Sequence, residues 1–83
     1  MPEEKVTAFI LLVTEIGREY EVKDSIARVA SEAGVEAETY IVYGEYDVLV
    51  KLTAPSLKAI DKAVTKIRKL PGVIRTVTLI AST

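Results

Sequence analysis

The most constraining feature of the sequence is an internal repeat with an offset of 38 residues. It aligns apolar and glycine positions in the first half of the chain with those in the second half. The matched pairs are Val22 with Ile60, Ile26 with Val64, Val29 with Ile67, Gly34 with Gly72, and Val35 with Val73. In each copy the apolar residues have helical spacing, and a glycine then ends the helix before a β-branched residue. The sequence therefore predicts two copies of one β-α-β unit.

Six elements are expected in the order β-α-β-β-α-β. Pro55 is expected in the first turn of the second helix, and Pro71 and Gly72 are expected to end that helix. The expected strands are residues 5–14, 36–43, 46–53 and 73–81, and the expected first helix is residues 18–33. Two split β-α-β units give a ferredoxin-like α+β fold, in which an antiparallel sheet carries both helices on one face.

The first strand is apolar on both faces of the predicted sheet. Phe9 and Leu11 share one face, whereas Ile10 and Leu12 share the other. Two helices cover only one face, and a strand with a solvated face would alternate apolar and polar residues. Large apolar patches are rare on the surface of soluble monomers. We therefore expect the second face to be buried by dimerisation through the sheet.

The composition excludes several classes of protein. The chain has 83 residues, so residues 1–83 are expected to form a single domain. It contains no Cys and no His, which excludes disulfides and argues against zinc or another transition metal. No membrane-spanning run or signal peptide is evident, so we expect a cytoplasmic protein without membrane contact. The lack of Asn and Gln, together with many Glu and Lys, is typical of a thermophile.

Charge is unevenly distributed along the chain. Residues 1–47 contain 11 acidic and 4 basic residues, whereas residues 48–83 contain 1 acidic and 7 basic residues. A solvated second helix with cations near its C-terminus explains the basic half, because cations suit that end of the helix dipole. A nucleic-acid surface is the alternative, although the net charge of −1 does not favour it.

Side chains suited to catalysis are scarce. Without His or Cys, a base or nucleophile would have to be Asp, Glu, Lys, Tyr, Ser or Thr. No carboxylate pair stands at a suggestive spacing, and the four glycines are isolated, so no phosphate-binding loop is present. We therefore expect neither an enzyme nor a cofactor.

Residues 43–47, Tyr-Gly-Glu-Tyr-Asp, join the second and third strands. Gly44 allows the chain to reverse, and Asp47 places a charge where the third strand should already run. A tight turn with a solvated acid explains this pattern, and so does a loop shaped to bind a ligand. The tyrosines around Gly44 also fit ordinary strand packing with their hydroxyls at the rim.

Three motifs, taken in order, resemble a known family. They are Thr14-Glu15-Ile16-Gly17-Arg18-Glu19, the segment 43–47, and a Leu-Pro-Gly-Val turn at 70–73 that runs into Thr76-Val77-Thr78-Leu79. Together they resemble the effector-binding domain of Lrp/AsnC-type transcription regulators, the RAM (regulation of amino acid metabolism) domain. The resemblance covers essentially the whole chain. Two departures from the full regulators are apparent. No helix-turn-helix is expected within residues 1–83, and the first helix ends in Ala-Gly-Val where many relatives show Pro-Gly-Val.

The resemblance implies a regulatory module that binds an amino acid effector. It implies a homodimer that assembles further, with an octamer expected, and effector sites between dimers. The implied effector-binding residues are Gly44, Glu45, Tyr46 and Asp47, with Thr76 and Thr78 as further contacts. Asp47 would receive the ammonium group, and backbone N–H groups near the glycine would receive the carboxylate. Regulation is then expected through a partner, such as a full-length Lrp/AsnC regulator, and not through specific DNA binding.

Two other functions are compatible with the same fold. A dimeric α/β-barrel enzyme of the monooxygenase type is one, although such sites generally need a His that this chain lacks. The other is an interaction domain that binds no small molecule and docks through its basic second helix.

Overall fold

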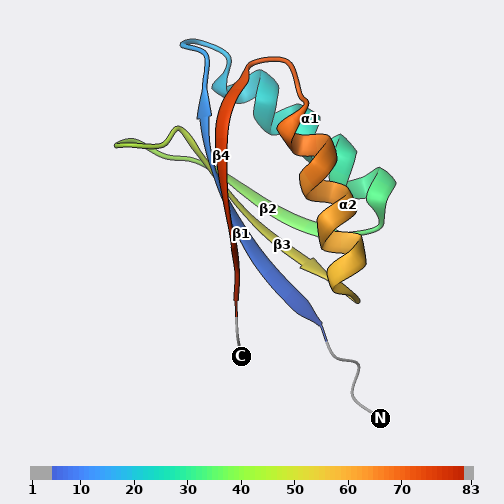
Figure 1. The fold of residues 1–83 in the computed structure, drawn as a ribbon. Helices are drawn as coiled ribbons and strands as arrows, with labels where there is room; N and C mark the ends of the chain where they lie inside the picture. Colours follow the sequence, from blue (N-terminus) through green and yellow to red (C-terminus); the bar gives the residue numbers. More distant parts are fainter. Residues whose placement is uncertain (1–4, 82–83) are drawn as a thin grey trace.

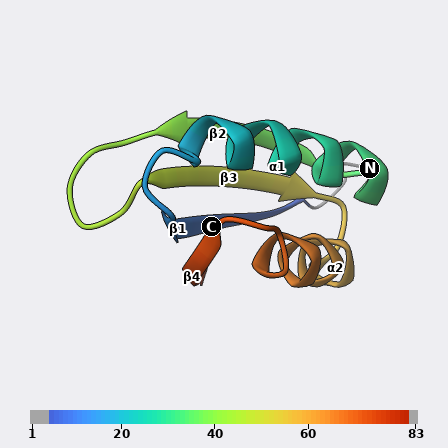
Figure 2. The ribbon, with the colours of Figure 1, turned by 90° about the horizontal axis from the view of Figure 1, so that it is seen from above.

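The computed structural model describes residues 5–81, which form a four-stranded antiparallel sheet and two helices (Figure 1). The elements are β1 (Val6–Thr14), α1 (Glu19–Ala33), β2 (Glu36–Ile41), β3 (Val48–Ala54), α2 (Leu57–Arg68) and β4 (Val73–Ile80). The strand order is β2-β3-β1-β4, so the two β-α-β halves interleave in one sheet (Figure 2). The structure confirms the predicted ferredoxin-like fold.

The hydrophobic core lies between the sheet and the helices. Ile10 and Leu12 of β1 are completely buried on this side, where they join Val22 of α1 and Ile60 of α2 in one cluster. Val22 and Ile60 are matched positions of the sequence repeat, so the repeat reflects equivalent places in the core. Burying each large aliphatic side chain contributes about 2 kcal/mol to stability.

The other face of the sheet is not covered by any element of residues 5–81 (Figure 1). The strand register places Leu11 between Leu49 and Val77, and it places Phe9 opposite Leu79. These side chains remain partly accessible, and Leu79 is 52% exposed. We call the set Phe9, Leu11, Val13, Leu49, Val77 and Leu79 the open apolar face.

Both helices have the predicted apolar sides, but the start of α2 differs from the prediction. Pro55 was expected in the first helical turn, and this expectation is wrong because Ser56 is the N-cap. The Ser56 hydroxyl accepts a hydrogen bond from the Ala59 N–H at 3.1 Å, which satisfies a donor that the helix leaves free. The end of α1 is as predicted, because Gly34 takes a left-handed conformation with φ of 71°.

The connection between β2 and β3 is longer than predicted. Residues 36–43 and 46–53 were expected to be strands, but β2 ends at Ile41 and β3 begins at Val48. Residues 42–47 therefore form a loop that projects from the sheet (Figure 1). Their β-branched and aromatic residues favour strand locally, but the β2–β3 ladder ends at the pair Ile41 with Val48.

In the part of the chain that the structure describes, no helix is long and apolar enough to cross a membrane.

Candidate functional site

The 42–47 loop is closed by main-chain hydrogen bonds at its base. The Val42 N–H donates to the Asp47 carbonyl at 3.0 Å, which joins the first and last residues of the loop. The Asp47 N–H donates to the Leu12 carbonyl of β1 at 2.9 Å. The loop therefore leaves the sheet from a fixed base beside the central strand.

The Asp47 side chain also attaches the loop to β1. Its Oδ2 accepts a hydrogen bond from the Thr14 N–H of β1 at 2.8 Å, across 33 positions of sequence. Because the last β1–β3 pair is Leu12 with Val48, this carboxylate bonds an N–H that β3 no longer reaches. Asp47 is thus more than a solvated acid in a tight turn, and one of its two carboxylate oxygens is already engaged.

Residues 43–45 at the tip of the loop are exposed to solvent. An added Cβ at Gly44 would meet nothing within 4 Å, and Tyr43 is 94% exposed. The N–H groups of residues 43–46 donate to no atom of residues 5–81. These four donors and the second Asp47 carboxylate oxygen therefore have no hydrogen-bond partner within residues 5–81.

Tyr46 links the loop to the edge strand β4. The guanidinium of Arg75 lies over the Tyr46 ring, 5.6 Å from its centroid, which is within the range of a cation–π contact. Arg75 pairs with Val13 in the β1–β4 register and so lies at one end of the open apolar face. The loop therefore reaches the rim of that face.

Thr76 and Thr78, the other two predicted effector-binding residues, lie apart from the 42–47 loop. They pair with Leu12 and Ile10, so both belong to the helix side of the sheet. Both line an open groove of about 940 Å³ between α2 and β4, which also includes Leu57, Val64 and Ile80. No residue of the 42–47 loop lines this groove. Within one chain, the structure brings Gly44–Asp47 together but does not join the two threonines to them.

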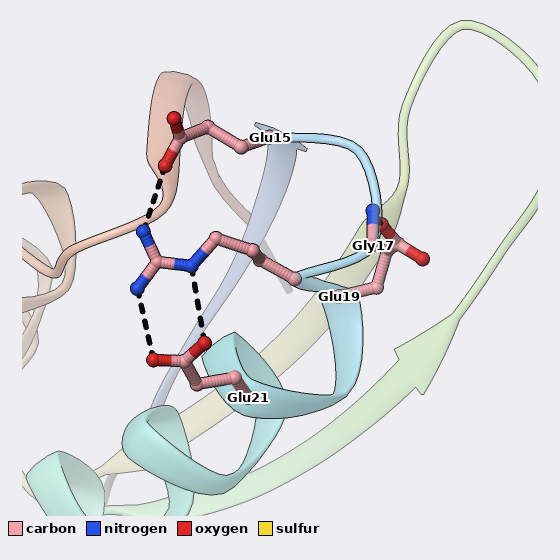
Figure 3. A network of polar contacts seen from close by, with 5 residues as sticks. Glu15, Gly17, Glu19 and Glu21 are labelled. Atoms are coloured by element: carbon pink, nitrogen blue, oxygen red, sulfur yellow. Dashed lines mark hydrogen bonds and ion pairs between the residues drawn. The ribbon is translucent and has the colours of Figure 1, made fainter.

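Arg18 forms a charged cluster that the sequence reasoning missed (Figure 3). Its guanidinium bonds Glu15 Oε1 at 2.8 Å and both carboxylate oxygens of Glu21 at 2.8 and 3.0 Å. The hydrogen bonds and positive charge of Arg18 lower the pKa of the Glu21 carboxyl from its ordinary value. The spacing of three residues between Arg18 and Glu21 was the available signal, since such positions are neighbours at the start of a helix.

The Arg18 cluster connects two turns at the same end of the sheet. The Glu15 N–H donates to the Gly72 carbonyl at 2.8 Å, so the β1–α1 turn touches the turn before β4. Arg18 lies over Gly72, where an added Cβ would be 3.3 Å from Arg18 Nε. Because Thr14 bonds Asp47, all three loops at this end are linked through the end of β1.

No group of three His, Cys, Asp or Glu residues that could hold a metal ion gathers anywhere in residues 5–81.

The fold and the uncovered sheet face place the chain in the class of small ferredoxin-like α+β domains. The family model of the Lrp/AsnC ligand binding domain matches residues 7–83, and the chain belongs to this family. It is therefore a regulatory ligand-binding domain of the kind found in transcription regulators, as its motifs indicated.

The chain is similar to one curated regulator and to several solved structures. It is 34% identical over 76 residues to an uncharacterized HTH-type transcriptional regulator of Pyrococcus furiosus. That match covers 90% of this chain and 50% of the regulator, so the chain spans about half the length of its curated relative. The structure of FFRP-DM1 is 46% identical with a TM-score of 0.79, and the match covers 93% of this chain and 99% of that one. A hypothetical protein from Pyrococcus horikoshii is also 46% identical, with a TM-score of 0.75 and coverage of 94% and 90%.

Proposed function

We propose that this chain is an amino-acid-responsive regulatory module that binds its effector at the 42–47 loop. The observation that carries the proposal is the loop itself, in which backbone donors without partners lie within four residues of the Asp47 carboxylate on a fixed base. Membership of the Lrp/AsnC ligand-binding domain family supports a small-molecule effector.

The chemistry of a free amino acid fits this loop. An amino acid carries an ammonium group and a carboxylate on one carbon. The Asp47 oxygen that does not bond Thr14 can accept from the ammonium in a charge-assisted hydrogen bond. The free N–H groups around Gly44 can donate to the carboxylate, and Glu45 and Tyr46 then border the effector side chain.

Self-association is the second part of the proposal. The open apolar face is the surface through which two copies would form a dimer, and further assembly, such as an octamer, would bring loops and grooves of different copies together. Thr76 and Thr78 would contact an effector only in such an assembly, because their groove is separate from the loop within one chain. Binding would then change the assembly or its association with a partner, such as a full-length Lrp/AsnC regulator.

Titration calorimetry tests the effector directly. Each amino acid is titrated into the protein, followed by its N-acetyl derivative and its amide. We expect binding heat for at least one free amino acid, with a Kd between about 1 μM and 1 mM. Both derivatives should bind at least about tenfold more weakly, because each removes one charged group that the loop would recognise.

Two results would contradict the proposal. One is silence across the panel at millimolar ligand. The other is equal affinity for a free amino acid and its N-acetyl derivative, because the ammonium would then make no contact.

A further inference from the structure

Asp47 stands where the sheet ends and the loop begins. Strand β1 continues two residues beyond the last β1–β3 pair, Leu12 with Val48. The N–H of Thr14 would therefore face a gap left by the departing chain. Asp47 Oδ2 accepts from that N–H at 2.8 Å, so a side-chain oxygen replaces the missing strand acceptor.

Three polar groups of Asp47 hold the loop against β1 and close it. The Asp47 N–H bonds the Leu12 carbonyl, the Asp47 carbonyl accepts from the Val42 N–H, and Oδ2 accepts from the Thr14 N–H. The first and third of these bonds attach the loop to β1, and the second closes the loop on itself. A carboxylate that accepts a backbone N–H makes one of the stronger hydrogen bonds in proteins.

The end of β1 also contains an unsatisfied polar group. Thr14 is 4% exposed, and its Oγ1 has no hydrogen-bond partner among residues 5–81. A buried hydroxyl without a partner is costly, and opening this end of the sheet to water would relieve the cost. The Asp47–Thr14 bond therefore opposes a local opening that the Thr14 hydroxyl favours.

We propose that Asp47 is the positioning residue of the 42–47 loop and that its two carboxylate oxygens have different tasks. Oδ2 acts only as a hydrogen-bond acceptor that closes the loop on β1, and an uncharged acceptor suffices for this. Oδ1 is the oxygen left for a cationic ligand group. The second task rests on the proposed function, whereas the first does not.

Two variants of Asp47 distinguish the two tasks. Asp47→Asn keeps a carbonyl oxygen that can accept from the Thr14 N–H, but it removes the negative charge. Asp47→Ala removes both. Asp24→Asn and Asp24→Ala are matched controls, because Asp24 is an exposed acid on α1 whose side chain makes no hydrogen bond within residues 5–81.

Hydrogen exchange of the Thr14 amide in the ligand-free protein measures the first task. We expect Asp47→Asn to exchange at nearly the wild-type rate and Asp47→Ala to exchange at least about tenfold faster. Both Asp24 variants should keep the wild-type rate at Thr14. Exchange of the Leu52 amide in β3 shows that each variant is still folded.

A third variant keeps the test decisive if Asp47→Ala does not fold. Thr14→Val retains the backbone N–H and removes the unsatisfied hydroxyl, so the protection factor of the residue 14 amide, corrected for the intrinsic exchange rate, should rise by about threefold or more. The proposal is overturned if folded Asp47→Ala keeps the wild-type rate, if Asp47→Asn exchanges as fast as Asp47→Ala, or if Thr14→Val speeds exchange.

Calorimetry of Asp47→Asn then measures the second task. We expect the affinity for the effector amino acid to fall by about tenfold or more while the Thr14 amide stays protected. Undiminished affinity would overturn the assignment of Oδ1. If no amino acid binds the wild type, the proposed function fails, and the positioning result is unaffected because it is measured without ligand.

Discussion

Gly72 is the residue at which the turn before β4 passes over the start of α1. Its φ is +92°, a conformation that residues with a side chain rarely adopt. A Cβ at this position would lie 3.2 Å from Val22 Cγ2 and 3.3 Å from Arg18 Nε. Val22 is completely buried, so it has little freedom to move away.

Gly72→Ala should therefore destabilise the protein for two reasons. Alanine is strained at this positive φ, and its Cβ would crowd Val22 and Arg18. Gly17→Ala is the matched control, because Gly17 has φ of +87° but an added Cβ would meet nothing within 4 Å. Urea unfolding should show a loss of about 1–2 kcal/mol in the free energy of unfolding for Gly17→Ala, from conformation alone. Gly72→Ala should lose about 1 kcal/mol more. Equal losses would show that the contact with Val22 and Arg18 has no energetic weight.

Sequence reasoning identified Asp47 as unusual but could not determine its contacts. A charge directly before an apolar strand is visible in the sequence, whereas its bond to the Thr14 N–H depends on where β1 and β3 meet in space. The Arg18 cluster, in contrast, was missed although its signal is local in the sequence. The spacing of Arg18 to Glu15 and Glu21 is a local signal, but exposed ion pairs of this kind are common on protein surfaces and contribute little to stability.

Among the elements, the helices were predicted better than the strand ends. Helical spacing identifies the buried side of α1 and α2, because the same residues must face the core. The ends of β2 and β3 were placed wrongly, because Val42, Tyr43 and Tyr46 favour strand by local propensity. Ser56 was overlooked as the N-cap because the adjacent Pro55 also fits a helix start.

The open apolar face of the sheet leads to a prediction about self-association. Leu11 lies at the centre of this face, between Leu49 and Val77. Leu11→Lys should weaken self-association at least about 100-fold, because an unpaired charge would be buried in the dimer. Sedimentation velocity should then show a dimer or larger species for the wild type and a monomer for the variant.

Leu57→Lys is the control for the sheet face. Leu57 is 57% exposed on α2, on the helix side of the sheet, so its replacement should leave the dimer intact. A monomeric wild type at micromolar concentration would contradict dimerisation through the sheet. If Leu11→Lys self-associated as strongly as the wild type, the dimer interface would have to lie outside the open apolar face.

At the scale of the whole molecule, the chain has two separate regions that the sequence had combined into one site. The 42–47 loop lies at the end of the central strands, whereas Thr76 and Thr78 lie in the groove between α2 and β4. The repeat predicted the architecture because both halves use the same core positions. It could not predict which side of the sheet each threonine occupies relative to the loop, because that depends on the β1–β4 register.

The most direct test of the effector site is to map backbone amide shifts by NMR while an amino acid that gives binding heat is titrated in. We predict the largest shifts at residues 43–47 and at Leu12 and Thr14, because the loop and the end of β1 are joined through Asp47. Shifts confined to residues of the groove between α2 and β4, with no change in the amide shifts of residues 43–47, would contradict effector binding at the 42–47 loop.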